Sequence, residues 1–165
     1  MIAIRARFVP ALLVLTAVAA AIADGPWGAG AASMSPNLAL QATAGADSEY
    51  SGQYLARFAI DGKISLPGSQ DDLNRAWCVR GDTHRNGAEF TLGWTNAIPV
   101  AEVVYWGHTA WFAEECWKDY ELWFDGAAAP AVRGRFEMVH GPQRIKLPRP
   151  VLTRKLLLKF TSSYG

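Results

Sequence analysis

Apolar and polar residues alternate over several short stretches of the chain, which is the pattern of half-buried β-strands. In the clearest stretch, Phe90, Leu92 and Trp94 alternate with Glu89 and Thr91. The strands are expected at residues 90–94, 103–106, 120–124 and 156–160, with shorter candidates at 38–43, 135–139 and 144–147. The strand at 103–106 is apolar on both faces, so a central place in a sheet is expected for it.

Turn-forming residues separate these stretches, at Asn86-Gly87, Asp125-Gly126, Gly141-Pro142 and Pro148-Arg149-Pro150. No window carries a sustained helical stripe, and only one helical turn is expected, within residues 52–60. Short strands with turns at this spacing predict an all-β chain folded as an antiparallel β-sandwich or jelly roll.

The first 23 residues have a different pattern. Arg5 and Arg7 precede an apolar run, and Ala21-Ile22-Ala23 forms a small-x-small cleavage pattern before Asp24. This order predicts a secretory signal peptide at residues 1–23, and hence a secreted or periplasmic protein. The alternative is an uncleaved membrane anchor, but the run is short for a span and contains Pro10.

The composition divides at the same place. Residues 24–36 are rich in Gly, Ala and Ser and are expected to be a flexible spacer before a domain at 37–165. Sixteen basic residues face fifteen acidic ones, and this balance argues against a nucleic-acid partner. No membrane span is expected after removal of the signal.

The domain resembles a known family. The runs that carry the resemblance include Ala59-Ile60-Asp61-Gly62, Glu89-Phe90-Thr91-Leu92 and Lys118-Asp119-Tyr120-Glu121-Leu122. With their order, they resemble discoidin domains, also called coagulation-factor type C (F5/8 type C) domains, and the related family 32 carbohydrate-binding modules. The resemblance implies an eight-stranded galactose-binding-like jelly roll with ligand-binding loops at one end, and a role in adhesion or sugar binding.

One departure from the family pattern concerns the end of the chain. The family continues with a turn and a final strand carrying a Glu, whereas this sequence stops at Gly165. We therefore expect a C-terminally truncated domain, which is either a fragment, a piece of a larger multidomain protein, or a natural variant.

The resemblance also implies a structural Ca²⁺ ion in the loop after Asp61. Ca²⁺ takes six to eight oxygen ligands, and Asp71 and Asp72 supply further carboxylates in this loop. The Glu that often completes the site is missing. The alternative is that Asp61 caps a turn through its own backbone.

Cys78 and Cys116 are the two cysteines of the chain. An even count in an oxidising compartment favours a disulfide between them. The alternative is two separately buried thiols.

The segment from 105 to 117 is a long loop rich in aromatic and acidic residues, and such loops are often functional. Sugars are bound by stacking on aromatic rings and by hydrogen bonds to their hydroxyls. Trp111 and Phe112 are the candidate stacking platform, and the candidate polar partners are His84, Arg85, Asn86 and Glu114. The alternative is that these aromatics fill the core, which is the expected place of Trp106 and Trp117.

The sequence contains none of the nucleophile-elbow, zinc-protease or phosphate-loop motifs of enzymes. Together with the resemblance and the aromatic loop, this implies a non-catalytic carbohydrate-binding module that recognises a polysaccharide or glycoprotein as the expected function. The alternatives are a protein–protein or cell-surface adhesion domain and a structural accessory domain of a larger secreted enzyme.

Overall fold

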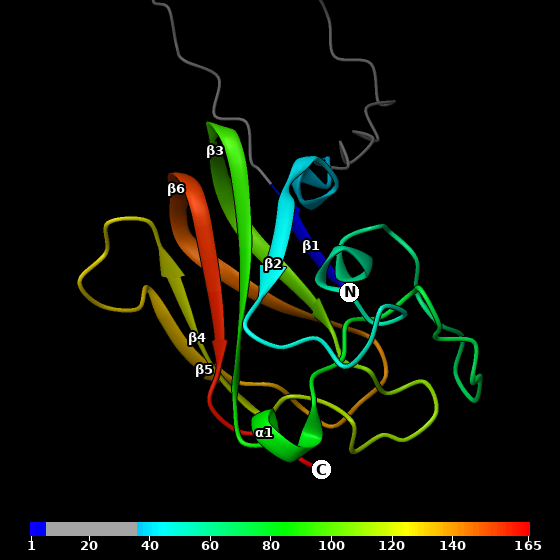
Figure 1. Cartoon of the computed structure of the whole chain (residues 1–165). Helices are drawn as coiled ribbons and strands as arrows, with labels where there is room; N and C mark the ends of the chain where they lie inside the picture. Colours follow the sequence, from blue (N-terminus) through cyan, green and yellow to red (C-terminus); the bar gives the residue numbers. More distant parts are fainter. Residues whose placement is uncertain (6–35) are drawn as a thin grey trace, which may run out of the picture.

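The computed structural model describes residues 1–5 and 36–165. Its regular elements are almost all strands, with the helical α1 (Gly81–His84) and the 3₁₀ turns η1 (Leu38–Gln41) and η2 (Ala56–Ala59) between them (Figure 1). The strands are β1 (Ile2–Arg5), β2 (Thr43–Ala46), β3 (Ala88–Trp106), β4 (Asp119–Phe124), β5 (Val132–Arg135) and β6 (Pro142–Phe160).

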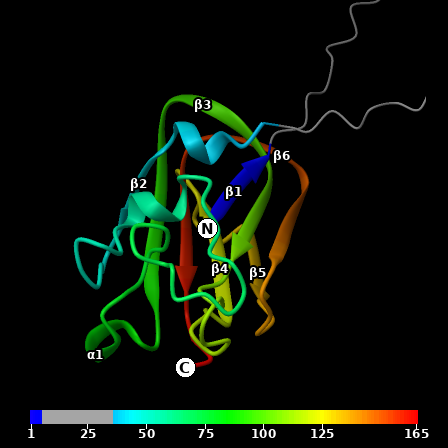
Figure 2. The ribbon, with the colours of Figure 1, turned by 90° about the vertical axis from the view of Figure 1, so that its right-hand side faces the viewer.

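All the strand pairs are antiparallel, in the order β1-β3-β6-β4-β5, with β2 also paired to β3. The long strands β3 and β6 pair along most of their length, and their register shifts between Gly93 and Ile98 and again after Val100. Figure 2 shows β3 arching over one end of the molecule at this place. The early half of β3 pairs with β2 and the late half with β1, so the sheet folds back into two layers.

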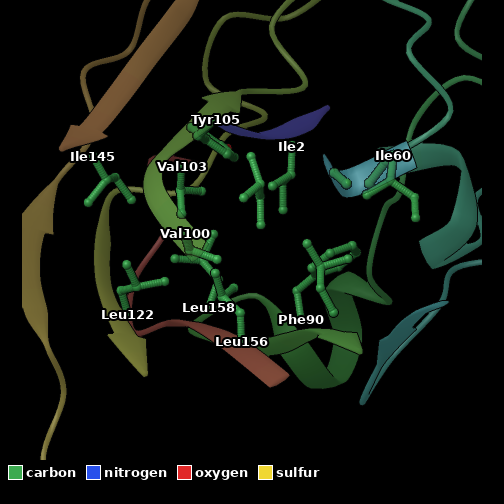
Figure 3. Packing of buried hydrophobic residues seen from close by; sticks show 14 of the residues in the cluster. Ile2, Ile60, Phe90, Val100, Val103, Tyr105, Leu122, Ile145, Leu156 and Leu158 are labelled. Carbon is green, nitrogen blue, oxygen red and sulfur yellow. The ribbon is translucent and has the colours of Figure 1, made fainter. Parts of the chain in front are cut away.

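Alternate side chains of both layers point between them and form the core. Figure 3 shows this packing, in which Phe90 and Val103 come from the two halves of β3. The fully buried members of the core include Ile4, Phe90, Leu92, Val100, Val103, Leu122, Leu156 and Leu158. Burial of these large aliphatic and aromatic side chains is the main stabilising contribution to the sandwich.

The predicted antiparallel β-sandwich is confirmed, with differences in single elements. The expected strands at 90–94 and 103–106 are one bent strand, β3, and those at 144–147 and 156–160 are one strand, β6. The turn expected at Pro148-Arg149-Pro150 is a register irregularity inside β6. Alternation breaks where a strand passes from one layer to the other, so the sequence pattern divides each long strand in two.

Two shorter strand predictions were wrong in position. Residues 38–41 form η1, because the Asn37 side chain accepts a hydrogen bond from the Ala39 amide (3.1 Å) and starts a turn, and the strand begins only at Thr43. The strand expected at 135–139 is β5, which ends at Arg135, and Phe136 then enters the core. The helical turn expected within 52–60 is confirmed as η2.

The N-terminal residues occupy a place that the sequence did not predict. Ile2–Arg5 pair with residues 102–105 of β3, and Ile2 and Ile4 are buried. Residues 6–23 of the predicted signal peptide, and all but the last residue of the predicted spacer, lie outside the described residues. The signal peptide and the spacer therefore stay predictions.

Aromatic rings gather where β3 and β6 end, beneath the loops, and we call them the aromatic floor. The Phe136 ring lies between those of Tyr105 and Tyr120, at centroid distances of 4.0 and 4.2 Å. Trp117 stacks on Phe160 at 4.8 Å with the planes 14° apart. Stacked aromatic pairs add about 0.5–1.5 kcal/mol to the effect of buried area, so the floor fixes the ends of the strands firmly.

In the part of the chain that the structure describes, no helix is long and apolar enough to cross a membrane.

The aromatic floor gives a first prediction. Phe136→Ala removes a ring that is 2% exposed and stacked on both sides, so we expect a loss of about 3–5 kcal/mol in the free energy of unfolding, measured by urea denaturation. Met138→Ala is the matched control, because this side chain is exposed, and a change within about 0.5 kcal/mol is expected. A loss below about 1 kcal/mol for Phe136→Ala would contradict the role of the floor.

Candidate functional site

A cavity of about 820 Å³ opens at the end of the sandwich where β3 and β6 terminate. Its walls come mainly from residues 50–85 and from the loop 107–117, two parts of the chain that are far apart in the sequence. It is also lined by Met1, Ile2, His140, Ser163 and Gly165. Trp77 lines its inner side together with Tyr105, Trp117 and Phe160, so part of the aromatic floor also lines the cavity.

His108 joins the two walls. Its Nε2 lies 2.8 Å from Oδ2 of Asp72 on one wall, and its Nδ1 lies 3.0 Å from Oε2 of Glu115 on its own loop. The hydroxyl of Tyr54 donates to the other oxygen of Asp72 at 3.1 Å. Partial burial, the hydrogen bond to Asp72 and the nearby carboxylates raise the pKa of Tyr54 to about 12, so this hydroxyl stays a donor at neutral pH.

Backbone contacts hold the loop 107–117 in shape. The Cys116 amide donates to the carbonyl of Glu114 at 2.7 Å, and the carbonyl of Ala110 accepts from the amide of Gly68 on the opposite wall at 2.7 Å. A Cβ at Gly107 would lie 2.9 Å from the Cβ of Cys116, so the loop closes this tightly only with glycine there.

Trp111 and Phe112 form an exposed corner on the wall of this cavity. Their side chains are 47% and 48% exposed, and their rings meet edge to face at 5.6 Å with the planes 77° apart. The two rings therefore do not form one flat platform. Tyr50, which is 61% exposed, lines the same cavity and is a further exposed aromatic ring.

The structure brings together four of the six residues that the sequence predicts as ligand contacts. Arg85, Trp111, Phe112 and Glu114 line the cavity. His84 does not line it: its ring nitrogen Nδ1 is 2.8 Å from the Thr83 hydroxyl, at the end of α1. Asn86 lines a separate shallow hollow beside α1, which Arg85 also borders.

The sequence did not single out Tyr50, Tyr54 or the interaction of Asp72 with His108. His108 and Glu115 stand in the distinctive aromatic loop, but their partner Asp72 is 36 residues before His108. A pattern of spacing cannot reveal such a pair, because only the folded sheet brings these loops together. The one available signal was the unusual set of ionisable residues within an aromatic loop.

The carboxylates predicted as Ca²⁺ ligands have separate protein partners. Asp71 pairs with Arg75 (3.1 Å) and Asp72 with His108, while Asp61 accepts from the Lys63 amide at 2.9 Å and lies 3.5 Å from its ammonium group. Within residues 1–5 and 36–165, no three His, Cys, Asp or Glu residues are grouped to hold a metal ion. Asp61 Oδ2 is buried without a hydrogen-bond partner. The ammonium group of Lys63 lies beside it, however, and this positive charge would repel a Ca²⁺ ion bound there. These three residues do not fit one common Ca²⁺ site, and the metal stays a prediction.

Trp106 and Trp117 are half-buried, and only Trp117 packs against the core cluster, as its stacking on Phe160 shows. Trp106 instead meets the His140 ring edge to face at 6.3 Å. The expectation of a core position is therefore confirmed for Trp117 alone.

Both cysteines line the cavity as free thiols, so the predicted disulfide is not formed in this structure and the pairing stays a prediction. Cys116 Sγ contacts the carbonyl of Ala113 at 3.3 Å. Burial raises the pKa of the Cys78 thiol to about 12 and that of Cys116 to about 11. Both thiols are therefore poor nucleophiles at neutral pH, since the thiolate is the reactive form.

The thiols give a second prediction. At pH 8, iodoacetamide should modify both in the folded chain at least about 100-fold more slowly than in urea, because the raised pKa values suppress the thiolate. The unfolded thiols lose their protons from about pH 9 while the folded ones keep theirs, so stability should fall as the pH rises above 9. Mass spectrometry counts the labels, with Cys78→Ser and Cys116→Ser assigning each. In urea without reductant, two labels would show two free thiols, as in this structure, and no label would establish the disulfide.

Solved structures of carbohydrate-binding modules resemble this chain. The family 32 module of C. perfringens NanJ, solved in complex with galactose, has a TM-score of 0.63 at 18% identity, over 77% of this chain and 87% of that one. A Clostridium perfringens module in complex with GalNAc-β-1,3-galactose has a TM-score of 0.61 at 18% identity, over 77% and 88%. A fucose-binding module of Streptococcus pneumoniae has a TM-score of 0.57 at 15% identity, over 78% and 86%.

No protein-family model matches the sequence, and no curated protein matches it. At these identities the likeness to solved structures is one of fold. The resemblance found in the sequence is confirmed at the level of fold: the chain has a jelly-roll fold like that of family 32 carbohydrate-binding modules.

Proposed function

We propose that this protein is a non-catalytic module that binds glycans in the cavity at the loop end of the sandwich. The observation that carries the proposal is the exposed corner of Trp111 and Phe112 on the wall of a cavity that also presents Arg85 and Glu114. A sugar ring has an apolar C–H face and a polar rim, and this wall offers a partner for each. Sites of this kind combine an apolar wall with a few placed polar groups.

The right angle between the two rings suits a single sugar unit. One ring can stack on the C–H face while the other closes the side, which positions the hydroxyls toward the polar side chains. A flat protein surface would bury such a corner less completely. The corner therefore favours a sugar end or branch over a broad protein interface.

His108 is assigned a positioning role in this proposal. Both of its ring nitrogens face carboxylates, and both oxygens of Asp72 are engaged, so these groups have little capacity left for a ligand. They fix the loop that carries Trp111 against the opposite wall. A rigid loop loses less conformational entropy when a ligand binds.

The comparisons support the ligand class. The similar solved modules are described as bound to galactose or to GalNAc-β-1,3-galactose, or as fucose-binding. By analogy, we propose galactose-, GalNAc- or fucose-containing glycans, free or on glycoproteins, as the partners. A secreted or periplasmic location, with the module either alone or attached to a larger enzyme, is consistent with such ligands. The analogy is one of fold, so the ligand class itself depends on the test below.

A third prediction tests the proposal. Affinity electrophoresis and a glycan array should show binding by the full chain, and Trp111→Ala should weaken it about 10- to 100-fold, the effect expected from losing a large apolar contact. Leu152→Ala is the matched control, because Leu152 is an exposed apolar residue on β6 away from the cavity, and it should bind like the unmodified chain. Thermal unfolding of both variants checks that the fold is kept.

Two results would contradict the proposal. The first is an intact, folded chain that binds no glycan, which would favour an adhesion or accessory role. The second is binding that Trp111→Ala and Leu152→Ala leave equally unchanged, which would place the glycan elsewhere on the molecule.

A further inference from the structure

Pairing with β3 and burial of its side chains hold the strand β1 in the sheet. Its register places Ile2 opposite Tyr105 and Ile4 opposite Val103, and the Trp106 amide donates to the carbonyl of Met1 at 2.7 Å. Figure 3 shows Ile2 directed into the core near Val103 and Ile60. Thirty residues, 6–35, separate β1 from the next described segment of the chain. Because Ile2 and its partner Tyr105 are far apart in the sequence, no tight turn joins β1 to β3.

The groove that β1 occupies has a defined chemistry. Ile2 and Ile4 are 2% and 0% exposed, and Ala3 between them is 8% exposed. Both faces of the strand are thus covered, and a small residue, Ala3, lies between the two aliphatic side chains. The Ile4 amide also donates to the Asn37 side chain at 3.0 Å, so β1 contacts this residue in addition to β3.

We propose that the edge of β3 between residues 102 and 106 is a strand-acceptor groove. It binds an extended segment of the form aliphatic–small–aliphatic, antiparallel to β3, and its occupant in this chain is residues 2–5. Main-chain hydrogen bonds supply part of the affinity, and the alternate aliphatic side chains supply the specificity, as in other cases of β-strand addition.

The segment that fills the groove, residues 2–5, is also predicted to act in export. Residues 2–5 also lie in the positively charged start of the predicted signal peptide, and one segment cannot insert into an export channel and complete the sheet at the same time. Where this prediction holds, folding of the precursor competes with export. A chain cleaved after Ala23 would lose β1, and its groove would be open to this same segment added as a separate peptide.

The fourth prediction begins from the full chain. A site-specific protease sequence placed within residues 24–35 allows the folded protein to be cut, and the two pieces are separated in urea. The larger piece is refolded alone, with a synthetic peptide of residues 1–7, or with the same peptide carrying Ile2→Ser and Ile4→Ser. Fluorescence anisotropy of the labelled peptides and thermal unfolding of the larger piece are the measurements.

The native peptide should bind with one peptide per chain and raise the unfolding temperature as its concentration rises, because it binds only the folded state. The Ser-substituted peptide should bind about 100-fold more weakly, since two buried aliphatic side chains are lost. If the larger piece does not fold alone, the native peptide should restore its near-UV circular dichroism. The proposal is overturned if the native peptide neither binds nor stabilises, or if both peptides act alike. None of these readouts depends on glycan binding.

Discussion

The stacked aromatic rings beneath the loops are the constraint on which the candidate site depends. The loops that surround the cavity contain little regular structure, so few of their backbone groups are fixed by a sheet or a helix. Tyr105, Trp117 and Phe160 line the cavity beneath them, with Trp117 stacked on Phe160. Phe136 supports this layer from behind, stacked between Tyr105 and Tyr120. Trp77 extends the floor, with its ring 5.0 Å from that of Phe90. Since large flat rings bury much area with few rotatable bonds, they give irregular loops a rigid base at a low cost in entropy.

The two long strands bring this floor and the loops together. Because β3 and β6 each cross from one layer to the other, both ends of β3 and the end of β6 reach the same end of the sandwich (Figure 2). Residues from distant parts of the sequence therefore meet there, and His108 completes the arrangement by joining Asp72 to Glu115. The cavity is thus a product of the strand topology, and its aromatic corner is held in place by the contacts of His108 with two carboxylates.

The sequence predicted the layers of this fold better than its connections. Period-two alternation identified the core residues of β3, β4 and β6, because burial between two layers imposes that period. It divided β3 and β6, because a bend interrupts the period while the strand continues. It could not find β1, whose short apolar segment has the composition of an export signal. At the site, the exposure of Trp111 and Phe112 could be predicted, because they stand in an aromatic loop between strands. The contact of Asp72 with His108 and the separation of His84 from the cavity could not, because they depend on how distant loops meet in the folded chain.

In the proposed binding mode, a glycan stacks on Trp111 and leaves the aromatic floor undisturbed. The chain has seven tryptophans, and each gives one indole N–H signal in a ¹⁵N-edited NMR spectrum, which single Trp→Phe variants assign. Titration with galactose and with GalNAc-β-1,3-galactose is the direct measurement. We expect a saturable shift of the Trp111 signal with little change in the signals of Trp77 and Trp117. A saturable shift confined to other tryptophans, or no shift at any concentration of either sugar, would contradict it.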